Sequence, residues 1–159
     1  NGGTLFQPML VEKIGTETQT TYSGEPTVAR QLDYAAEAWE VARVGMCGVV
    51  ADETYGTGYW VFNREEAPAP YIACGKTGTA QAGYAPHAWF AAYAPADNPE
   101  VVVVAMSQHS REGSEVAAPM VRRALDLYFQ VDEVAPYPSW WWENRYVPLA
   151  VPENGVAGG

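Results

Sequence analysis

Two apolar segments joined by a four-residue turn constrain the fold of this chain more than any other feature. Residues 87–95 read HAWFAAYAP, residues 100–108 read EVVVVAMSQ, and ADNP lies between them. Asp, Asn and Pro favour tight turns, so the pattern predicts an antiparallel hairpin. The segment YIACGKT, residues 71–77, precedes it by the short link AQAGYAP, which predicts a three-stranded meander over residues 71–107. Because residues 101–104 are apolar on both faces, we expect the sheet to be covered on both sides.

Two further segments have the apolar spacing of helices. They are residues 34–50 and residues 115–129. Asp33 and Ser114 are the expected N-caps of these helices. Pro119 falls late for a first turn, so the second helix either begins one residue before it or is kinked there. Together with the meander, the two helices predict an α+β fold in which helices cover an antiparallel sheet.

The remaining segments carry weaker signals. Residues 1–14 contain an apolar, β-favouring run with a proline at its start, which is typical of an edge strand. The polar residues 15–31 predict a hairpin or loop, and residues 63–70 predict a surface loop. Residues 130–159 carry four prolines and no periodicity, so we expect a tail. Its three tryptophans, residues 140–142, are expected to cover apolar surface of their own domain in preference to forming a sugar-binding platform.

Composition excludes several functions. The formal net charge of −10 and the isoelectric point near 4.5 argue against nucleic acid as a partner and against a polybasic membrane anchor. No apolar run approaches the roughly 20 residues that a bilayer span requires. The chain shows no signal peptide and begins with Asn1, so we expect a processed product or a fragment.

The cysteines and histidines give no metal site. Cys47 and Cys74 do not have ligand spacing with His87 or His109, so neither a metal nor another cofactor is expected. From the residues alone, two buried thiols are favoured over one disulfide. We expect His87 to cap or pack and His109 to be exposed.

The stretch CGKTGTAQAG, residues 74–83, is the candidate functional motif. Lys76 is one of only two lysines, and it follows a glycine and precedes the segment Thr-Gly-Thr. A cation, two hydroxyls and approachable backbone suit a small anionic ligand. The alternative is a glycine-containing edge strand with one solvated lysine. A phosphate-binding loop is excluded, because G-x-x-x-x-G-K-T would need glycine where Pro70 stands.

Five segments, in this order, resemble class B penicillin-binding proteins. They read NGGTLFQPMLVEKI, GMCGVV followed by glycine–threonine–glycine, CGKTGTAQ, HAWFAAYAPADNPEVVVV and GSEVAAPMVRRALDLYF. The resemblance covers residues 1–129, leaving residues 130–159 as the tail. The compact link between GKTGTAQ and HAWF is more similar to elongation-type than to division-type enzymes. The resemblance implies the penicillin-binding, β-lactamase-like transpeptidase fold.

The chain departs from the family pattern in one respect. Lys13 and Lys76 are its only lysines and neither has a serine three residues before it, so S-x-x-K is absent, and S-x-N is absent as well. In the family both motifs lie upstream of the matched part. We therefore expect a C-terminal portion of a transpeptidase domain that is inactive alone. It should expose an apolar face where the absent part of the domain docks.

The family chemistry implies a role for each residue of the motif. A serine from the absent part attacks a D-alanyl-D-alanine stem peptide, and the acyl-enzyme passes to a neighbouring stem amine. Lys76 supplies fixed charge near the substrate carboxylate, which β-lactams also display, and Thr77 and Thr79 donate hydroxyls to it. Gly78 keeps the strand flat for substrate pairing, Gly75 leaves room behind, and the Thr79 N–H is an oxyanion-hole donor.

The resemblance also implies surroundings and an alternative. A membrane anchor upstream and the extracytoplasmic face of a bacterial membrane are expected, where Cys47 and Cys74 can be joined. The expected partners are peptidoglycan stem peptides, β-lactams, the absent part of the domain and the cell-wall elongation machinery. A non-catalytic, penicillin-recognising sensor or scaffold on the same fold stays open as the alternative.

Overall fold

The computed structural model describes residues 2–83 and 85–139 of the chain. It divides into two compact units, Asn1–Ala42 and Arg43–Gly159, which are described separately. The tryptophans at positions 140–142 lie outside the described residues, so neither interpretation of them is tested. In the part of the chain that is described, no helix is both long and apolar enough to cross a membrane.

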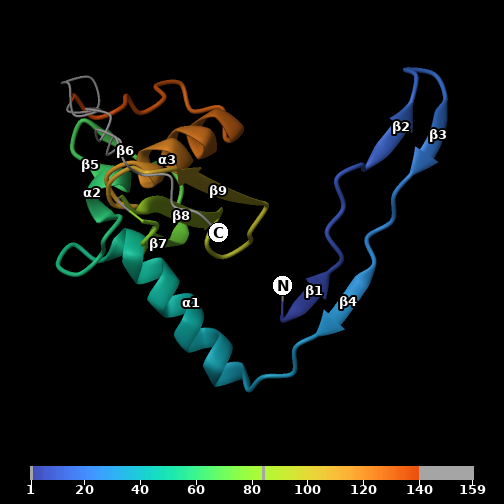
Figure 1. The fold of residues 1–159 in the computed structure, drawn as a ribbon, viewed down its shortest axis with the longest axis horizontal. Coiled ribbons are helices and arrows are strands. Elements are labelled where there is room, and N and C mark those ends of the chain that lie inside the picture. Colours follow the sequence, from blue (N-terminus) through green and yellow to red (C-terminus); the bar gives the residue numbers. More distant parts are fainter. Residues whose placement is uncertain (1, 84, 140–159) are drawn as a thin grey trace. The chain divides into compact units, whose positions relative to one another are not determined.

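The first unit is a long antiparallel hairpin arm (Figure 1). Its strands are β1 (Thr4–Phe6), β2 (Lys13–Gly15), β3 (Thr20–Ser23) and β4 (Val28–Gln31). Strand β1 pairs with β4 and β2 pairs with β3. The Gln7 N–H donates to the Thr27 carbonyl at 2.8 Å between the two ladders. The hairpin expected in residues 15–31 is therefore present, and residues 1–14 supply its other side.

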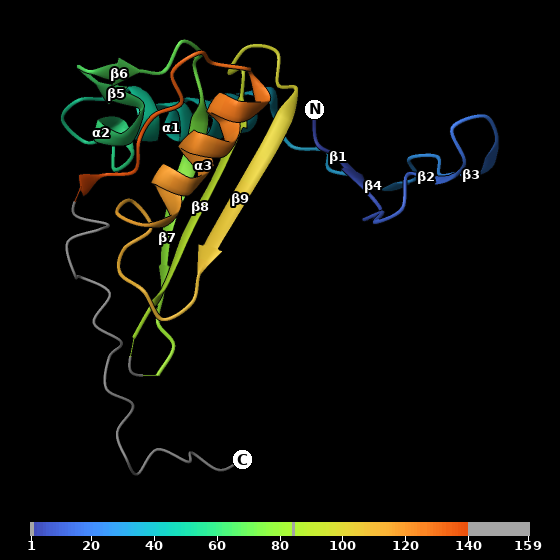
Figure 2. The same ribbon diagram turned by 90° about the horizontal axis from the view of Figure 1, so that it is seen from above.

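The second unit is built on the predicted three-stranded meander. Its strands are β7 (Cys74–Ala80), β8 (His87–Ala94) and β9 (Val101–Ser107), in the order β7-β8-β9 and antiparallel throughout. The strands run side by side in Figure 2, with α3 across one face. This order confirms the topology that the ADNP turn and the short link after the K-T-G segment predicted. Strand β7, which carries the motif, is an edge of this sheet.

Three helices and a two-stranded hairpin complete the described part of the chain. Their bounds are α1 (Ala36–Ala51), α2 (Tyr59–Phe62), β5 (Asn63–Arg64), β6 (Ala67–Pro68) and α3 (Ala117–Tyr128). Residues 63–70 were expected to form a surface loop, but they contain the β5–β6 pair, so that expectation is wrong.

Both predicted N-caps are wrong. Helix α1 begins at Ala36, and the Ala35 carbonyl accepts the N–H of Ala38 at 3.0 Å, so Asp33 lies too far upstream to cap it. Helix α3 begins at Ala117 with Val116 in the N-cap position and no side-chain cap. The prediction placed Ser114 there.

Pro119 is the third residue of α3 and so falls within its first turn. The N–H groups of the first turn have no partner inside a helix, so a residue that lacks one costs little there. Of the two alternatives, a helix that begins just before the proline is the one observed.

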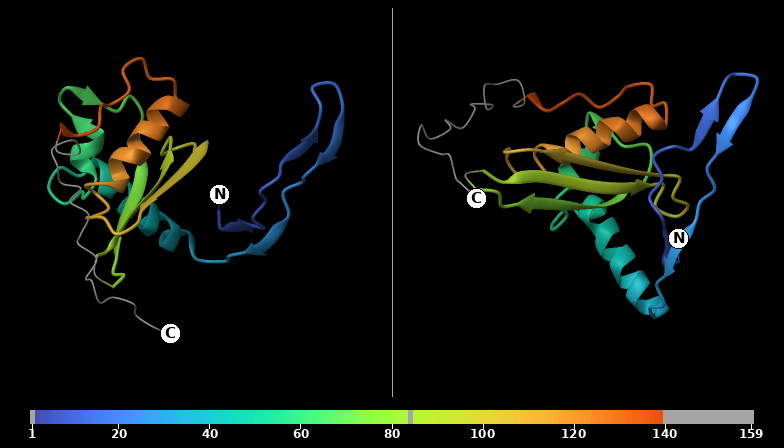
Figure 3. Two further views of the ribbon diagram at one scale, coloured as in Figure 1. Left: turned by 45° about the horizontal axis from the view of Figure 1, so that its top comes forward. Right: turned by 45° about the vertical axis from the view of Figure 1, so that its right-hand side comes forward.

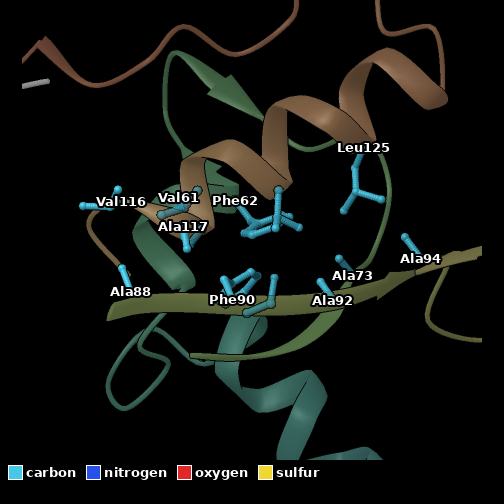
Figure 4. Packing of buried hydrophobic residues seen from close by; sticks show 13 residues of the cluster. Val61, Phe62, Ala73, Ala88, Phe90, Ala92, Ala94, Val116, Ala117 and Leu125 are labelled. Atoms are coloured by element: carbon cyan, nitrogen blue, oxygen red, sulfur yellow. The ribbon is translucent and has the colours of Figure 1, made fainter. Parts of the chain in front are cut away.

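The core lies between α3 and one face of the sheet (Figure 4). Phe62 of α2 and Phe90 of β8 face each other with ring centroids 6.0 Å apart, and Leu125 of α3 closes the cluster. All three side chains are almost completely buried. Burial of these apolar side chains stabilises the layer by roughly 25 cal/mol per Å² of area removed from water.

The opposite face of the sheet is exposed along β9, contrary to expectation. Along β9 the side chains alternate between half-buried and exposed, and Val102 is 68% and Val104 57% exposed. On the same face, Trp89 and its register partner Met106 are also exposed. Figure 3 shows α3 on one side of the strands only. Among the described residues α3 covers one face, and on the other face α1 reaches the Cys74 end while Val102 and Val104 stay exposed, so the cover on both faces that the valine run predicted is incomplete.

A buried ion pair connects α3 to its surroundings. Arg122 Nε donates to Asp126 Oδ1 at 2.7 Å, and both side chains are at most 2% exposed. Tyr71 donates its hydroxyl to the same Oδ1 at 2.7 Å, and the Ala135 N–H donates to Oδ2 at 2.9 Å. Burial and then the hydrogen bond to Asp126 raise the pKa of Tyr71 well above its usual range. Both oxygens of the Asp126 carboxylate are therefore hydrogen-bonded. The bond to the Ala135 N–H also holds the first part of the expected tail against the domain.

Candidate functional site

The K-T-G-T segment lies on edge strand β7, where its side chains alternate between the two faces of the sheet. In the register with β8, Thr77 lies opposite the buried Phe90, and Lys76 lies opposite Ala91 on the other face. Thr79 shares the face of Thr77. The structure thus places all the motif residues on one strand whose outer edge is unpaired among the described residues, but Lys76 and the threonines lie on different faces.

Lys76 is exposed and forms no ion pair with any described residue. Its Nζ donates to the carbonyl oxygen of its neighbour Thr77 at 2.5 Å. A neutral carbonyl satisfies only one of the three ammonium donors. The remaining donors are therefore available to an anion that approaches the edge of the sheet.

Thr77 has a hydroxyl partner that the sequence analysis missed. The Oγ1 atoms of Thr77 and Thr57 lie 3.0 Å apart, and either can donate. Thr57 is the middle residue of the glycine–threonine–glycine segment between α1 and α2. The sequence analysis used that segment only as part of the family pattern, because nothing in a sequence shows that residues 20 positions apart share a hydrogen bond.

Gly78 of the motif is packed against a second glycine. A Cβ on Gly113, which is buried between β9 and α3, would lie 2.6 Å from the Gly78 carbonyl oxygen and 3.0 Å from its nitrogen. It would also lie 2.2 Å from the Trp89 carbonyl oxygen. Only a residue without a side chain fits so close to a backbone. The segment before α3 therefore supports the motif strand directly, a contact that sequence reasoning also missed.

Gly75, the second residue of β7, is buried against the neighbouring strand and the core. A Cβ there would lie 2.8 Å from the Ala91 carbonyl oxygen and 2.9 Å from Phe90 Cζ. Packing against the core therefore accounts for glycine at this position, with a larger side chain excluded by its own sheet.

A disulfide joins Cys47 of α1 to Cys74, the first residue of β7. The free thiols favoured by composition are therefore wrong, and the bridge expected for an oxidising compartment is present. The Tyr93 hydroxyl lies 3.9 Å from Cys47 Sγ. The bond lies two residues before Lys76, so it ties the start of the motif strand to the end of a helix.

The other candidate groups are structural. The His109 N–H donates to His87 Nδ1 at 2.9 Å, and the two ring centroids are 4.8 Å apart. His87 thus packs and caps as expected, whereas His109 is half-buried, not exposed. The carboxylate pairs 52–53 and 65–66 are solvent-exposed, and Asp52 accepts backbone N–H groups of its own turn. Over residues 2–83 and 85–139 no cluster of His, Cys, Asp and Glu has the arrangement of a metal site.

Comparisons with known proteins agree with this arrangement. A family model described as the penicillin binding protein transpeptidase domain matches residues 1–126. The peptidoglycan D,D-transpeptidase MrdA of Haemophilus influenzae is 41% identical over 145 residues, which cover 80% of this chain and 21% of that protein. The chain therefore spans about a fifth of the length of this curated relative.

The solved structures that share the fold include one from Eggerthella lenta and one from M. tuberculosis. The D,D-transpeptidase domain of a peptidoglycan glycosyltransferase from Eggerthella lenta superposes with a TM-score of 0.65 at 27% identity, covering 85% of this chain and 30% of that one. The imipenem acyl-enzyme complex of penicillin-binding protein A from M. tuberculosis gives a TM-score of 0.62 at 26% identity, covering 82% and 28%. Similarity to MrdA agrees with the elongation-type preference read from the sequence. With most of its length matched by the family model, the chain belongs to the penicillin-binding protein transpeptidase domain family.

Proposed function

We propose that this chain is the C-terminal part of a serine D,D-transpeptidase that cross-links peptidoglycan stem peptides and binds β-lactams. The observation that carries the proposal is the K-T-G-T segment on a sheet edge that no other described strand pairs, with the Lys76 ammonium exposed beside it. The M. tuberculosis relative, captured as an imipenem acyl-enzyme, supports acylation by β-lactams in this family. Residues 1–129 form the transpeptidase portion in this proposal, and residues 130–159 are the tail.

The proposed reaction divides the work between this strand and residues outside the chain. A serine supplied from outside the 159 residues attacks the penultimate D-alanine carbonyl carbon, forming an ester while the terminal D-alanine leaves as the protonated amine. A stem-peptide amine then attacks the ester and regenerates the serine. Lys76 attracts the substrate carboxylate, Thr77 and Thr79 donate hydroxyls to it, and the Thr79 N–H binds the developing oxyanion.

The disulfide supports an extracytoplasmic location. Disulfides persist in oxidising compartments, where peptidoglycan is cross-linked, and are rare in the cytosol. The Cys47–Cys74 bond therefore fits a protein that faces the cell wall. We include in the proposal an anchor supplied by an upstream segment and contact with the elongation machinery.

Replacement of Lys76 tests this function. A charge-assisted hydrogen bond contributes about 1.5–3 kcal/mol, so Lys76→Ala should slow acylation of the complete protein by labelled penicillin at least about tenfold. Lys76→Arg should give an intermediate rate, because it keeps the charge but not the compact shape. Thermal stability should hardly change, since Lys76 is exposed and its side chain bonds only a neighbouring carbonyl.

Lys13→Ala is the matched control, because it removes the only other lysine, which is exposed on the first unit. It should acylate at the parent rate. Equal rates for Lys76→Ala and the parent would contradict the role of the motif. A complete protein that carries S-x-x-K but never acylates would favour a penicillin-recognising scaffold.

A further inference from the structure

The Thr57 hydroxyl, 3.0 Å from that of Thr77, has no role in the function proposed above. We propose that Thr57 is a positioning residue that directs the Thr77 hydroxyl toward the carboxylate of a bound substrate or β-lactam. It thereby favours ligands with a free carboxylate over their neutral counterparts. This inference rests on the proposed function of the K-T-G strand.

The turn that carries Thr57 is fixed from its first residue. Asp52, directly after α1, accepts the backbone N–H groups of Thr54 and Tyr55 at 2.8 Å each. The aspartate side chain thus satisfies two backbone N–H groups of the turn that follows the helix. The segment therefore leaves the helix in one defined direction.

The glycines on both sides of Thr57 dock on the end of α1. The Gly56 N–H donates to the Asp52 carbonyl and the Gly58 N–H to the Val49 carbonyl, each at 2.9 Å. A Cβ on Gly56 would lie 2.3 Å from the Asp52 carbonyl oxygen, so a side chain there would force the turn away from the helix. Thr57 is thus held between two backbone anchors, with the only side chain of the three.

The same turn is registered against the motif strand. A Cβ on Gly58 would lie 3.4 Å from Phe90 Cε2, and Phe90 is the register neighbour of Thr77. The disulfide at Cys47 joins α1 to β7 two residues before Val49. Helix α1, the turn and strand β7 are therefore held together on both sides of the Thr57–Thr77 contact. The distance between the two hydroxyls is thus set by the backbone and not by flexible side chains.

Hydroxyl chemistry determines what this pair does when an anion binds. A hydroxyl donates one hydrogen bond and accepts two, whereas a carboxylate only accepts. Thr77 can donate to a carboxylate only if it does not donate to Thr57. Thr57 must then be the donor between them. In that arrangement the Thr77 oxygen keeps a partner while its proton points to the ligand, and a chain of two hydrogen bonds polarises the outer one.

The test compares a penicillin with its methyl ester on the complete protein. Thr57→Val removes the hydroxyl and keeps the shape, and Thr57→Ser keeps the hydroxyl. We expect Thr57→Val to slow acylation by the free acid roughly three- to tenfold, the effect of one net hydrogen bond, and to change the rate with the ester less than twofold. Thr57→Ser should acylate as the parent does with both ligands.

Thr54→Val is the matched control, since it makes the same chemical change in the same turn, where Asp52 binds the backbone N–H of Thr54. The final fraction of acylated protein reports folding, so a misfolded variant loses amplitude and a mispositioned hydroxyl lowers the rate constant. Thr57→Val acting equally on acid and ester, or on neither, overturns the inference alone. A parent that is not acylated by the free acid overturns the proposed function and this inference with it.

Discussion

Gly113→Ala should slow acylation by displacing the motif strand, although residue 113 lies 35 positions from Gly78. Gly113 is buried, and the new Cβ would lie 2.2 Å from the Trp89 carbonyl oxygen and 2.6 Å from that of Gly78. Both oxygens belong to backbone of adjacent, paired strands. The segment before α3 cannot retreat freely either, because the Gly113 carbonyl accepts the N–H of Ala118 at 2.8 Å.

The size of the effect follows from these distances. Carbon and oxygen rarely approach closer than about 3.3 Å, so the substitution demands a backbone shift of about 1 Å. A misplacement of that size in positioning groups costs about 100-fold in rate. Overpacking a well-filled site costs about 1–3 kcal/mol in the free energy of unfolding. We therefore expect Gly113→Ala to acylate about 100-fold more slowly while most of the protein still folds.

Single-turnover acylation of the complete protein by labelled penicillin separates these effects. The rate constant reports the geometry of the site, and the final amplitude reports the folded fraction. Gly45→Ala is the matched control, because a Cβ there would meet nothing within 4 Å beyond its own helix backbone and the residue is exposed on α1. It should keep the parent rate. Full amplitude at the parent rate for Gly113→Ala would refute the claim that this contact positions the strand.

Two further predictions concern stability. Replacing Cys47 and Cys74 by alanine should lower the free energy of unfolding by about 3.5 kcal/mol, the chain-entropy value for a loop closed over a separation of 27 residues; an unchanged urea midpoint would contradict this. Tyr71 has a pKa raised by burial and by its bond to Asp126, so it stays neutral in the folded state above pH 10, where the unfolded state loses its proton. The stabilisation that Tyr71 contributes is therefore complete below pH 10, and above it decreases by about 1.4 kcal/mol per pH unit. In urea unfolding from pH 9 to 11, the free energy of unfolding should fall less steeply for Tyr71→Phe than for the parent.

The sheet was predictable because its information is local. The ADNP turn and the short link after the K-T-G segment permit only neighbouring antiparallel strands, and β7, β8 and β9 follow that order. The motif could therefore be placed on a strand from the sequence alone. Cover over the sheet is not local. The valine run indicates that both faces of β9 need apolar neighbours, but it does not say whether this chain supplies them, and the described residues cover only one face.

Helix ends and tertiary contacts were less accessible for the same reason. Ser114 has good N-cap chemistry, yet α3 starts later, where the Gly113 carbonyl binds the Ala118 N–H and both residues are buried. Packing there outweighs the contribution of about 1 kcal/mol that a cap makes. The disulfide and the Thr57–Thr77 bond likewise depend on which residues fold against one another, and each residue considered alone gives no sign of its partner.

Several residues of the motif strand are held by their neighbours whereas Lys76 is exposed, and this difference separates the predictions. Cys74 is bonded to α1, the Thr77 hydroxyl contacts that of Thr57, and Gly78 packs against Gly113. These three contacts fix the backbone along most of the motif. Lys76 projects into solvent. Substitutions that move this packed backbone, such as Gly113→Ala, should therefore change both rate and stability. A change at Lys76 should alter the rate alone, because electrostatic positioning works only when the strand that carries the charge is already in place.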